Sequence, residues 1–557
     1  MTTIAPAGFR THEVFNQAPP RTEVNEYNSN IPLLEGVTRH EAGWANGALA
    51  DVGDLVGTES FRSDAELANT VTPVFHSHDR YGNRIDEVEF HPAYHRIIGA
   101  AVAHGAHTAA WADPKPGANV ARAATFMLFA QVEAGHACPI SMTHSVVPAL
   151  EFTPEIAHTW LPRLYSRGYD GRLRAPGDKP GVLFGMAMTE KQGGSDVRAN
   201  TTRAVANPDG SWSLTGHKWF CSAPMSDAFL ILAQARGTAL AGDSALSCFL
   251  VPRVLEDGTR NVFRIQRLKD KLGNKSNASS EIELDGTVGY LVGEPGRGVR
   301  TIIEMVSRTR LDCVYGSAAG MRQSVAEALW HVRHRSAFGA TLIDQPAMTA
   351  VAADLALESE AATVTALRLA RAHDADAGPG EKAFRRLATA VSKYWICKRG
   401  PQHAYEALEC LGGNGYTEAF PLARRYREQP VMAVWEGSGN VIALDVLRAM
   451  TREPESVQAF DAELATARGA SALFDRHHDR MRAALTELAV LPSDRAQLRA
   501  RAVASSMALG LQAALLLRYS PTAVAEAFLA ARLGDDRDLQ YGSLPDGTDF
   551  AAILDRH

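Results

Sequence analysis

The sequence predicts an α+β protein in which a β domain lies between two helical domains and a further helical domain follows. Three observations support this order. Apolar residues recur three and four positions apart over most of the chain, short β-type runs with turn residues are confined to 181–295, and the helical period resumes beyond Pro454. A length of 557 residues and an apolar fraction of 46% suit several cores in a globular protein.

The N-terminal part divides into an arm and a helical domain. Residues 1–30 are rich in Pro, Asn and Thr and have no period, so they predict an extended arm that becomes ordered only against another surface. Residues 31–180 predict an N-terminal helical domain, because 94–110 and 121–134 carry apolar residues at helical spacing with Pro at several joints.

The middle β domain is expected over 181–295. Asn207-Pro208-Asp209-Gly210 has the composition of a tight turn, so it predicts a hairpin between the runs 203–206 and 211–214. The other expected strands are 181–188, 229–233, 247–251 and 281–284.

A C-terminal helical bundle is expected over 296–450, with long helices at 346–373 and 380–411, and an additional helical domain over 451–557 that ends in a polar tail. The most apolar late run, 502–517, is bounded by Arg501 and Arg518 and is shorter than a membrane span. It predicts a buried helix, and we expect no membrane association.

The charge, the cysteines and the N-terminus of the chain argue against several classes of function. The formal net charge of -6 argues against bulk attraction to nucleic acid or to an anionic membrane, although a local basic patch stays open. The six cysteines are scattered without metal-ligand spacing, which favours free thiols in a reducing cytoplasm and no metal site. The N-terminus lacks the pattern of a secretory signal.

Glu436 is the strongest candidate for a general base. It lies in the run Trp435-Glu436-Gly437-Ser438-Gly439-Asn440, where an aromatic precedes the carboxylate and two glycines allow a close approach to a flat ligand. Apolar residues follow at helical spacing, so Ser438 or Asn440 is expected to cap a helix whose positive end faces the same pocket. The alternative is a solvated turn.

A second polar stretch, 186–196 with 216–222, suits a planar heterocycle. Hydroxyls of Thr189, Ser195 and Ser222 would satisfy its polar rim, and Trp219 or Phe220 would cover a face. The glycines do not match a phosphate loop. The alternative is a hairpin loop with a core Trp.

Four motifs in order resemble the acyl-CoA dehydrogenase family. They are Met188 to Asp196, Arg335-Ser336-Ala337-Phe338-Gly339 with Gln345, Leu411 to Tyr416, and Trp435 to Ser438. The AidB branch, flavoproteins associated with the bacterial response to DNA alkylation, is more similar still. That resemblance covers nearly the whole chain and includes Lys191-Gln192 in place of the usual Pro, the run 267–274, the run 396–400 and the additional C-terminal domain.

The resemblance implies the acyl-CoA dehydrogenase fold, with an N-terminal helical domain, a middle β-barrel or sandwich and a C-terminal four-helix bundle. It implies FAD as cofactor and Glu436 as the base that removes the α-proton of an acyl-CoA while flavin N5 accepts the hydride. Some relatives carry the base at the position of Thr309, which cannot serve as one. The residues that the resemblance assigns to FAD are Met188, Thr189, Gly194, Ser195, Phe220, Cys221, Ser222, Arg335, Phe338, Gln345, Gly413, Trp435, Gly437, Ser438 and Asn440.

The resemblance also implies an oligomer. Arg335, Phe338 and Gln345 would come from a partner subunit to hold the adenosine half of FAD, and the family commonly forms homotetramers, dimers of dimers. Glu409 replaces the Gln of most relatives and would repel the pyrophosphate unless it points away or pairs with a base such as Arg335. No cluster for the phosphates of CoA is apparent.

Duplex DNA binding is a further implication of the AidB branch, with Arg448 as the matching contact. Residues 451–557 contain 12 Arg, no Lys and 15 Asp plus Glu. Arg476 with Arg480 and Arg495 with Arg499 could form one basic face, and the alternative is ordinary solvated arginines. Any binding would be backbone-directed and salt-sensitive.

Three functional classes stay open. The first is a dehydrogenase of an acyl-CoA or acyl-like substrate, the second a DNA-associated protective flavoprotein, and the third a catalytically decayed scaffold. The sequence does not identify the acyl substrate or the electron acceptor.

Overall fold

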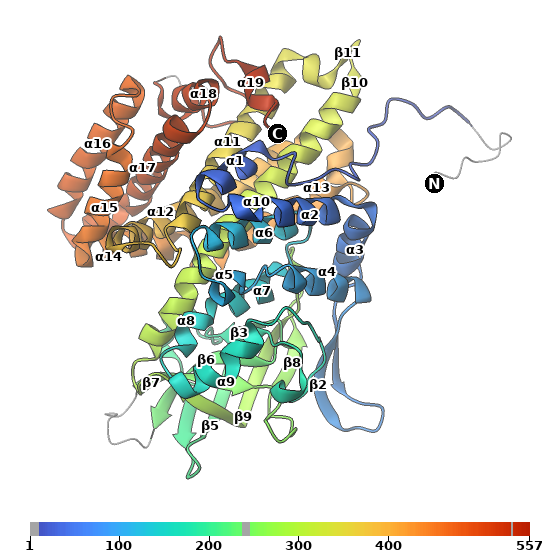
Figure 1. Cartoon of the computed structure of the whole chain (residues 1–557), viewed down its shortest axis with the longest axis vertical. Helices are drawn as coiled ribbons and strands as arrows, with labels where there is room; N and C mark the ends of the chain where they lie inside the picture. Colours follow the sequence, from blue (N-terminus) through green and yellow to red (C-terminus); the bar gives the residue numbers. More distant parts are fainter. Residues whose placement is uncertain (1–10, 237–244, 536–537) are drawn as a thin grey trace.

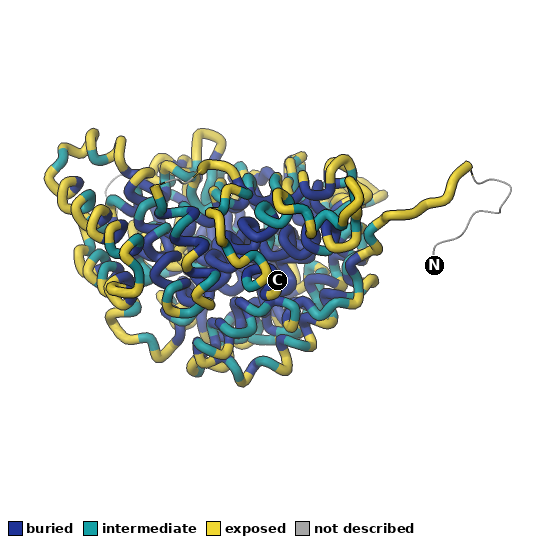
Figure 2. Tube along the Cα trace, turned by 90° about the horizontal axis from the view of Figure 1, so that it is seen from above, coloured by how far each residue is buried: buried dark blue, intermediate teal, exposed yellow. Residues whose placement is uncertain are grey.

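The computed structural model describes residues 11–236, 245–535 and 538–557, and its elements follow the predicted α+β order (Figure 1). The first ten residues of the predicted arm lie outside the described residues. Residues 11–20 are mostly exposed, and from Arg21 onward the arm packs on the body of the protein (Figure 2). The predicted order of helical and β domains is confirmed.

The N-terminal part is helical, with one exception. Its main helices are α1 (Ile31–Arg39), α2 (Asn46–Gly57), α3 (Glu59–Thr70), α4 (Pro92–Ala103), α6 (Ala118–Val132), α7 (Ala137–Ser145) and α9 (Pro154–Leu164). Two strands that were not predicted, β1 (Val74–His78) and β2 (Arg84–Glu89), form an antiparallel hairpin.

The hairpin has a local and a tertiary cause. The Asp79 carboxylate accepts from the backbone N–H groups of Tyr81 and Asn83 at 2.8 and 2.9 Å, which closes an Asx-type turn, and Gly82 adopts φ 87°. Asp86 then accepts from the backbone N–H of Ile265 at 2.9 Å in the β domain. Because a contact with the β domain helps to stabilise this hairpin, its local sequence pattern is too weak to predict the two strands.

Within the described residues the β domain has seven strands, of which β4, β5, β6, β7 and β9 form a closed barrel: β3 (Phe184–Ala187), β4 (Arg203–Ala206), β5 (Trp212–Ser222), β6 (Ala228–Arg236), β7 (Ala245–Pro252), β8 (Arg264–Leu268) and β9 (Ser279–Val292). The pairings β6–β4, β4–β5, β5–β9, β9–β7 and β7–β6 close the sheet on itself. The predicted 203–206/211–214 hairpin is confirmed. Strand β8 was missed because its exposed face is polar.

The helical bundle is formed by α10 (Gly298–His334), α11 (Pro346–Arg371), α12 (Pro379–Glu409) and α13 (Pro421–Val434), and both α10 and α12 contact the other three helices. Helix α14 (Gly439–Arg452) leads into the additional domain of α15 (Pro454–Ala465), α16 (Ala472–Ala489), α17 (Ser493–Tyr519) and α18 (Thr522–Leu533). This domain lies on one flank of the bundle, on the opposite side from the projecting arm (Figure 1).

Helix α17 contains the predicted buried run. It is long and apolar enough to cross a membrane by length and composition, yet 67% of its most apolar window is buried inside the protein, as in a core helix. The polar tail differs from the prediction, because it contains α19 (Phe550–Leu554) with Ile553 fully buried.

Candidate functional site

Glu436 lies in a sharp turn between α13 and α14. The backbone of Glu436 has φ 59° and that of Gly437 φ 121°, both in the left-handed region. For a non-glycine residue this is strained and persists only where surrounding contacts impose it. The contacts are Lys393 Nζ, which donates to the carbonyls of Trp435 (3.0 Å) and Gly437 (2.5 Å), and Arg310 Nε, which donates to the carbonyl of Glu436 (2.8 Å).

The Glu436 side chain has the environment of a poised base. Its Oε2 is shielded from solvent and has no hydrogen-bond partner within the described residues. Burial raises the pKa of this carboxyl above its ordinary value, while Thr309, Arg310 and Lys393 act in the opposite direction. Thr309 occupies the position that carries the base in some relatives, and it lies beside the Glu436 side chain. Because threonine has no carboxylate, Glu436 is the base that this turn offers.

The pKa shift has a testable consequence for pH. Because only the ionised carboxylate accepts a proton, and because its folded pKa is raised, activity is expected to be full above that pKa and to be lost as pH falls through it. The acidic limb should lie above the ordinary pKa of a glutamate. A profile of flavin reduction rate against pH measures this, and an acidic limb at or below the ordinary glutamate value would contradict the assigned environment.

The loop after β3 is held by a buried ion pair. Glu190 Oε1 accepts from Lys218 Nζ at 2.8 Å, and both side chains are fully buried. Glu190 also accepts from the backbone N–H groups of Thr201 and Thr202 at 2.7 and 3.1 Å. The carbonyl of Thr189 accepts from the backbone N–H of Trp219 at 2.8 Å, which fixes the loop against β5.

Met188, Thr189, Gly194 and Ser195 are half-buried or exposed on this loop, as residues that line a ligand would be. Because the loop is tied at both ends, its hydroxyls are presented from a rigid frame.

The three predicted FAD contacts on strand β5 do not all lie on the same face of the strand. Phe220 is 47% exposed, and the Ser222 hydroxyl is half-buried at 3.0 Å from that of Ser279. Cys221 lies between them and is fully buried in the barrel core. Since successive side chains of a strand point to opposite faces, the Cys221 thiol does not share the face of Phe220 and Ser222. Any contact of Cys221 with the cofactor is therefore limited to its backbone.

The start of α14 brings the additional domain to this site. Ser438 occupies the N-cap position, but neither it nor Asn440 makes a side-chain capping bond, contrary to the prediction. Asn440 Oδ1 instead accepts from Arg501 Nε on α17 at 2.8 Å. Lys398 Nζ and Arg501 Nη2 both lie beside Gly439, and burial and the neighbouring Arg501 lower the pKa of Lys398.

Lys393, Lys398 and Arg501 were not predicted as site residues. Lys398 belongs to the 396–400 run that resembles the AidB branch, but nothing in its spacing indicates a role near Glu436. Lys393 and Arg501 lie in helices far from Glu436 in the sequence, so only tertiary packing reveals them.

Arg335, Phe338 and Gln345 lie away from this site within one chain. They surround the short hairpin of β10 (Ser336–Ala337) and β11 (Ala340–Thr341), at the opposite end of the molecule from the β domain (Figure 1). Phe338 is 99% exposed at its tip, and Gln345 Nε2 donates to the carbonyl of Ala337 at 2.7 Å. Such a tip suits contact with a second chain.

Gly413 is exposed in the turn that follows α12. Glu409 is exposed as well, and Arg335 donates to the carbonyl of Asn16 on the arm. The predicted alternative of a Glu409–Arg335 pair is therefore replaced, within one chain, by contact of Arg335 with the arm.

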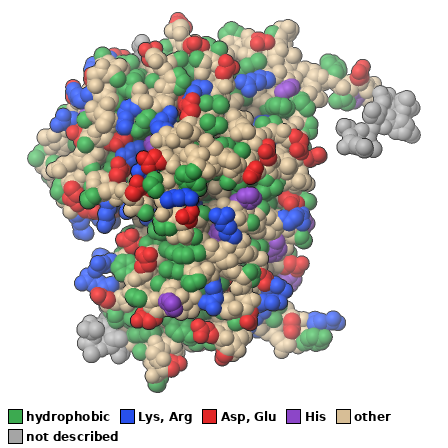
Figure 3. All heavy atoms as spheres, viewed as in Figure 1, with side chains coloured by type: hydrophobic (Ala, Val, Ile, Leu, Met, Phe, Trp, Pro, Cys, Tyr) green, Lys and Arg blue, Asp and Glu red, His purple; other side chains and the backbone are tan. Residues whose placement is uncertain are grey.

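Arg448 projects from α14. Its side chain is 58% exposed, and it lies 3.4 Å from Asp445, which also accepts from Arg310 at 3.0 Å. Arg448 is thus linked through Asp445 to the arginine that holds the Glu436 carbonyl. On the face drawn in Figure 3, acidic and basic side chains are interspersed.

Comparison with known proteins identifies three family regions. Residues 16–171 match the adaptive response protein AidB N-terminal domain, residues 185–287 the acyl-CoA dehydrogenase middle domain, and residues 296–451 the acyl-CoA dehydrogenase C-terminal domain. These matches agree with the predicted fold and resemblance.

Individual relatives are similar to this chain over most of its length. The chain is 47% identical over 470 residues to the putative acyl-CoA dehydrogenase AidB of Escherichia coli, covering 84% of this chain and 86% of the relative. The structure of Caenorhabditis elegans ACDH-11 in complex with C11-CoA has a TM-score of 0.83 at 26% identity, covering 100% of this chain and 95% of that one. An acyl-CoA dehydrogenase complexed with FAD from Bacillus anthracis, at 17% identity and a TM-score of 0.67, shares the fold over 89% of this chain and 84% of that one.

Proposed function

Because this chain belongs to the AidB branch of the acyl-CoA dehydrogenase family, whose members are FAD-dependent oxidoreductases acting on CH–CH groups, we propose that it dehydrogenates the α,β bond of an acyl-CoA thioester. The observation that carries the proposal is the Glu436 turn. A shielded carboxylate with a raised pKa is held there by three donated hydrogen bonds to its backbone and neighbours.

In this proposal, residues of the Glu436 turn and its neighbours each have a defined role in the reaction. Glu436 takes the α-proton at its carboxylate, and its backbone N–H holds the thioester oxygen, where negative charge develops. Lys393 and Arg310 fix the turn and so place the carboxylate. Trp435 packs beside the barrel and shields the base from water, which keeps the pKa high. FAD bound there supplies the acceptor for the β-hydride.

The described residues fit FAD. Phe220 offers an exposed aromatic face, Ser222 a hydroxyl on the same face, and Ser438 a hydroxyl that is not used for capping. The Trp435 indole N–H and Glu436 Oε2 are shielded polar atoms without partners among the described residues. Because Arg335, Phe338 and Gln345 project from the far tip, we place them against the FAD of a partner subunit in a homotetramer.

Arg501 gives this proposal a distinctive prediction. Its guanidinium contacts Asn440, which is assigned to the pyrophosphate region, and Lys398 lies beside it, so the additional domain contributes positive charge to the cofactor site. Arg501→Gln is expected to weaken FAD binding by about tenfold, roughly 1.4 kcal/mol. Titration of the apoprotein with FAD measures this, and Arg495→Gln, an exposed change on the same helix, is the control. Equal affinity of the two variants would remove Arg501 from the site.

The proposed activity is tested by anaerobic addition of acyl-CoAs from short branched to long chain to the yellow protein. Bleaching by one class of acyl-CoA supports the dehydrogenase and names that class, for which the C11-CoA complex of the nematode relative suggests a medium to long chain. A yellow protein that no acyl-CoA reduces would contradict it. A colourless protein that cannot be loaded with FAD would instead indicate a decayed scaffold. We further propose a cytoplasmic location, which the six free cysteines favour.

A second candidate function is association with duplex DNA in an alkylation response. It is favoured by the exposed Arg448 and by the names of the AidB relatives, and opposed by the acidic balance of residues 451–557. Fluorescence anisotropy with duplex DNA at two salt concentrations tests it. Binding that weakens with salt and in Arg448→Gln supports this role. No binding even at low salt excludes it.

A further inference from the structure

A cavity of about 370 Å³ lies between the inner part of the N-terminal arm and the helices α3, α10 and α13. It is separate from the proposed catalytic site, because neither Glu436 nor any residue assigned to FAD lines it. The volume falls within the usual range for small-molecule sites. The cavity therefore needs an explanation of its own.

Four arginines and four glutamates line this cavity: Arg21, Arg62, Arg424 and Arg425 with Glu59, Glu66, Glu327 and Glu418. Two further buried charges, Glu26 and Arg322, do not line it, and Glu418 pairs with Arg427, which does not line it either. Arg21 and Arg62 pair with Glu26, Arg62 also pairs with Glu327, and Arg424 pairs with Glu66 at 2.6 Å. Within the described residues, Arg322 and Arg425 have no carboxylate partner.

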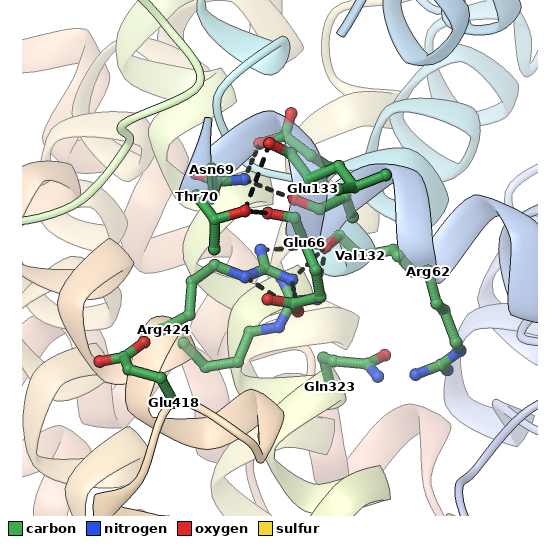
Figure 4. A network of polar contacts seen from close by, with 12 residues as sticks. Arg62, Glu66, Asn69, Thr70, Val132, Glu133, Gln323, Glu418 and Arg424 are labelled. Carbon is green, nitrogen blue, oxygen red and sulfur yellow. Dashed lines mark hydrogen bonds and ion pairs between the residues drawn. The ribbon is translucent and has the colours of Figure 1, made fainter. Parts of the chain in front are cut away.

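Among the described residues, Arg425 is the arginine of the cavity wall that has no carboxylate partner. It is only 3% exposed, its Nε has no hydrogen-bond partner within the described chain, and it donates to the carbonyl of Val132. Arg424 donates to that same carbonyl at 3.3 Å and also to Glu66, so the Glu66 carboxylate pairs with Arg424 and not with Arg425 (Figure 4).

Burial, and then the neighbouring Arg424, lower the pKa of Arg425 to about 9. A buried charge without a counter-ion is costly, and an anion supplied from outside would relieve that cost. The geometry thus leaves room for a negative group at Arg425.

The rest of the wall is largely apolar. Leu411, Phe420 and Trp330 line it together with Pro19 and Pro20 of the arm. Trp330 Nε1 donates to the carbonyl of Pro19 at 2.7 Å, which fastens the arm over the cavity. An occupant would therefore place a charged head on the arginine and an apolar body against these side chains.

We propose that this cavity is a second binding site, which takes a small organic anion with a carboxylate or phosphate head on Arg425 and an apolar body beneath the arm. Both heads accept the two parallel N–H groups that a guanidinium presents. The inference is independent of the dehydrogenase proposal, because it uses none of the catalytic or FAD-binding residues.

Isothermal titration of the FAD-loaded protein with octanoate, octyl phosphate and octan-1-ol tests the site. Saturable binding of octanoate or octyl phosphate, without binding of the neutral alcohol, is expected, and the stronger of the two anions identifies the head group. Arg425→Gln should weaken that binding at least tenfold, whereas Arg80→Gln, an exposed arginine in the β1–β2 turn, should leave it unchanged.

A second variant tests the site independently, in case Arg425→Gln does not fold. Ala419→Trp changes an exposed lining residue and leaves every charge in place, and it should block binding by filling the cavity. Glu436→Gln should bind the anion like the wild type. The proposal is overturned if neither anion binds, if octan-1-ol binds equally well, if Ala419→Trp binds normally, or if Glu436→Gln abolishes binding.

Discussion

Glu436→Gln is expected to lower the rate of flavin reduction by acyl-CoA by about 10³- to 10⁴-fold, at the upper end of what a positioned general base contributes. The amide keeps the size of the side chain but cannot accept the α-proton. The turn should persist, because Lys393 and Arg310 hold it through backbone carbonyls. FAD content and thermal stability are therefore expected to stay close to those of the wild type.

Stopped-flow absorbance of the flavin under anaerobic conditions measures the rate, and denaturation followed by quantitation of released FAD measures loading. Glu526→Gln is the matched control, since this glutamate is exposed on α18 and lies outside the turn. Unchanged reduction in Glu436→Gln would remove Glu436 as the base.

Glu190→Gln is expected to destabilise the β domain by about 3–5 kcal/mol, the cost of leaving a buried charge without its partner. Lys218 is fully buried, donates to the Leu232 carbonyl at 2.8 Å, and has its pKa lowered to about 8 by burial even with Glu190 present. The change also weakens the bonds to the Thr201 and Thr202 backbone, so the loop that carries Thr189 and Ser195 should loosen and FAD affinity should fall.

Urea denaturation and FAD titration measure the two effects. The double variant Glu190→Gln, Lys218→Met should recover part of the stability, because it removes the unpaired charge of Lys218. It should not recover the FAD affinity, because the loop that carries Thr189 and Ser195 still lacks the Glu190 carboxylate. A single variant as stable as the wild type would show that the pair does not hold the loop.

The sequence was most informative where local pattern and tertiary structure agree. The long helices α11 and α12 carry a continuous helical period, and the Asn207–Gly210 turn fixes the β4–β5 hairpin by its own chemistry. Glu436 was recognisable because its flanking aromatic and glycines are adjacent in the chain.

Other features depended on contacts that are distant in sequence. The β1–β2 hairpin is anchored by Asp86 on the β domain, and Cys221 could be assigned to the core only once the register of β5 against β9 was known. The meeting of Arg501 with Asn440, and of Arg425 with Val132, joins residues from different helices, which no spacing rule reveals.

The central claim is that Glu436 and bound FAD together remove two hydrogens from an acyl-CoA. Anaerobic single-turnover mixing of the FAD-loaded protein with an acyl-CoA of the class that bleaches it tests this most directly, with product analysis by mass spectrometry. We predict one 2-enoyl-CoA, two hydrogens lighter than its substrate, for each flavin reduced. Substrate that remains unchanged while the flavin stays oxidised, for every acyl-CoA in the panel, would contradict the account.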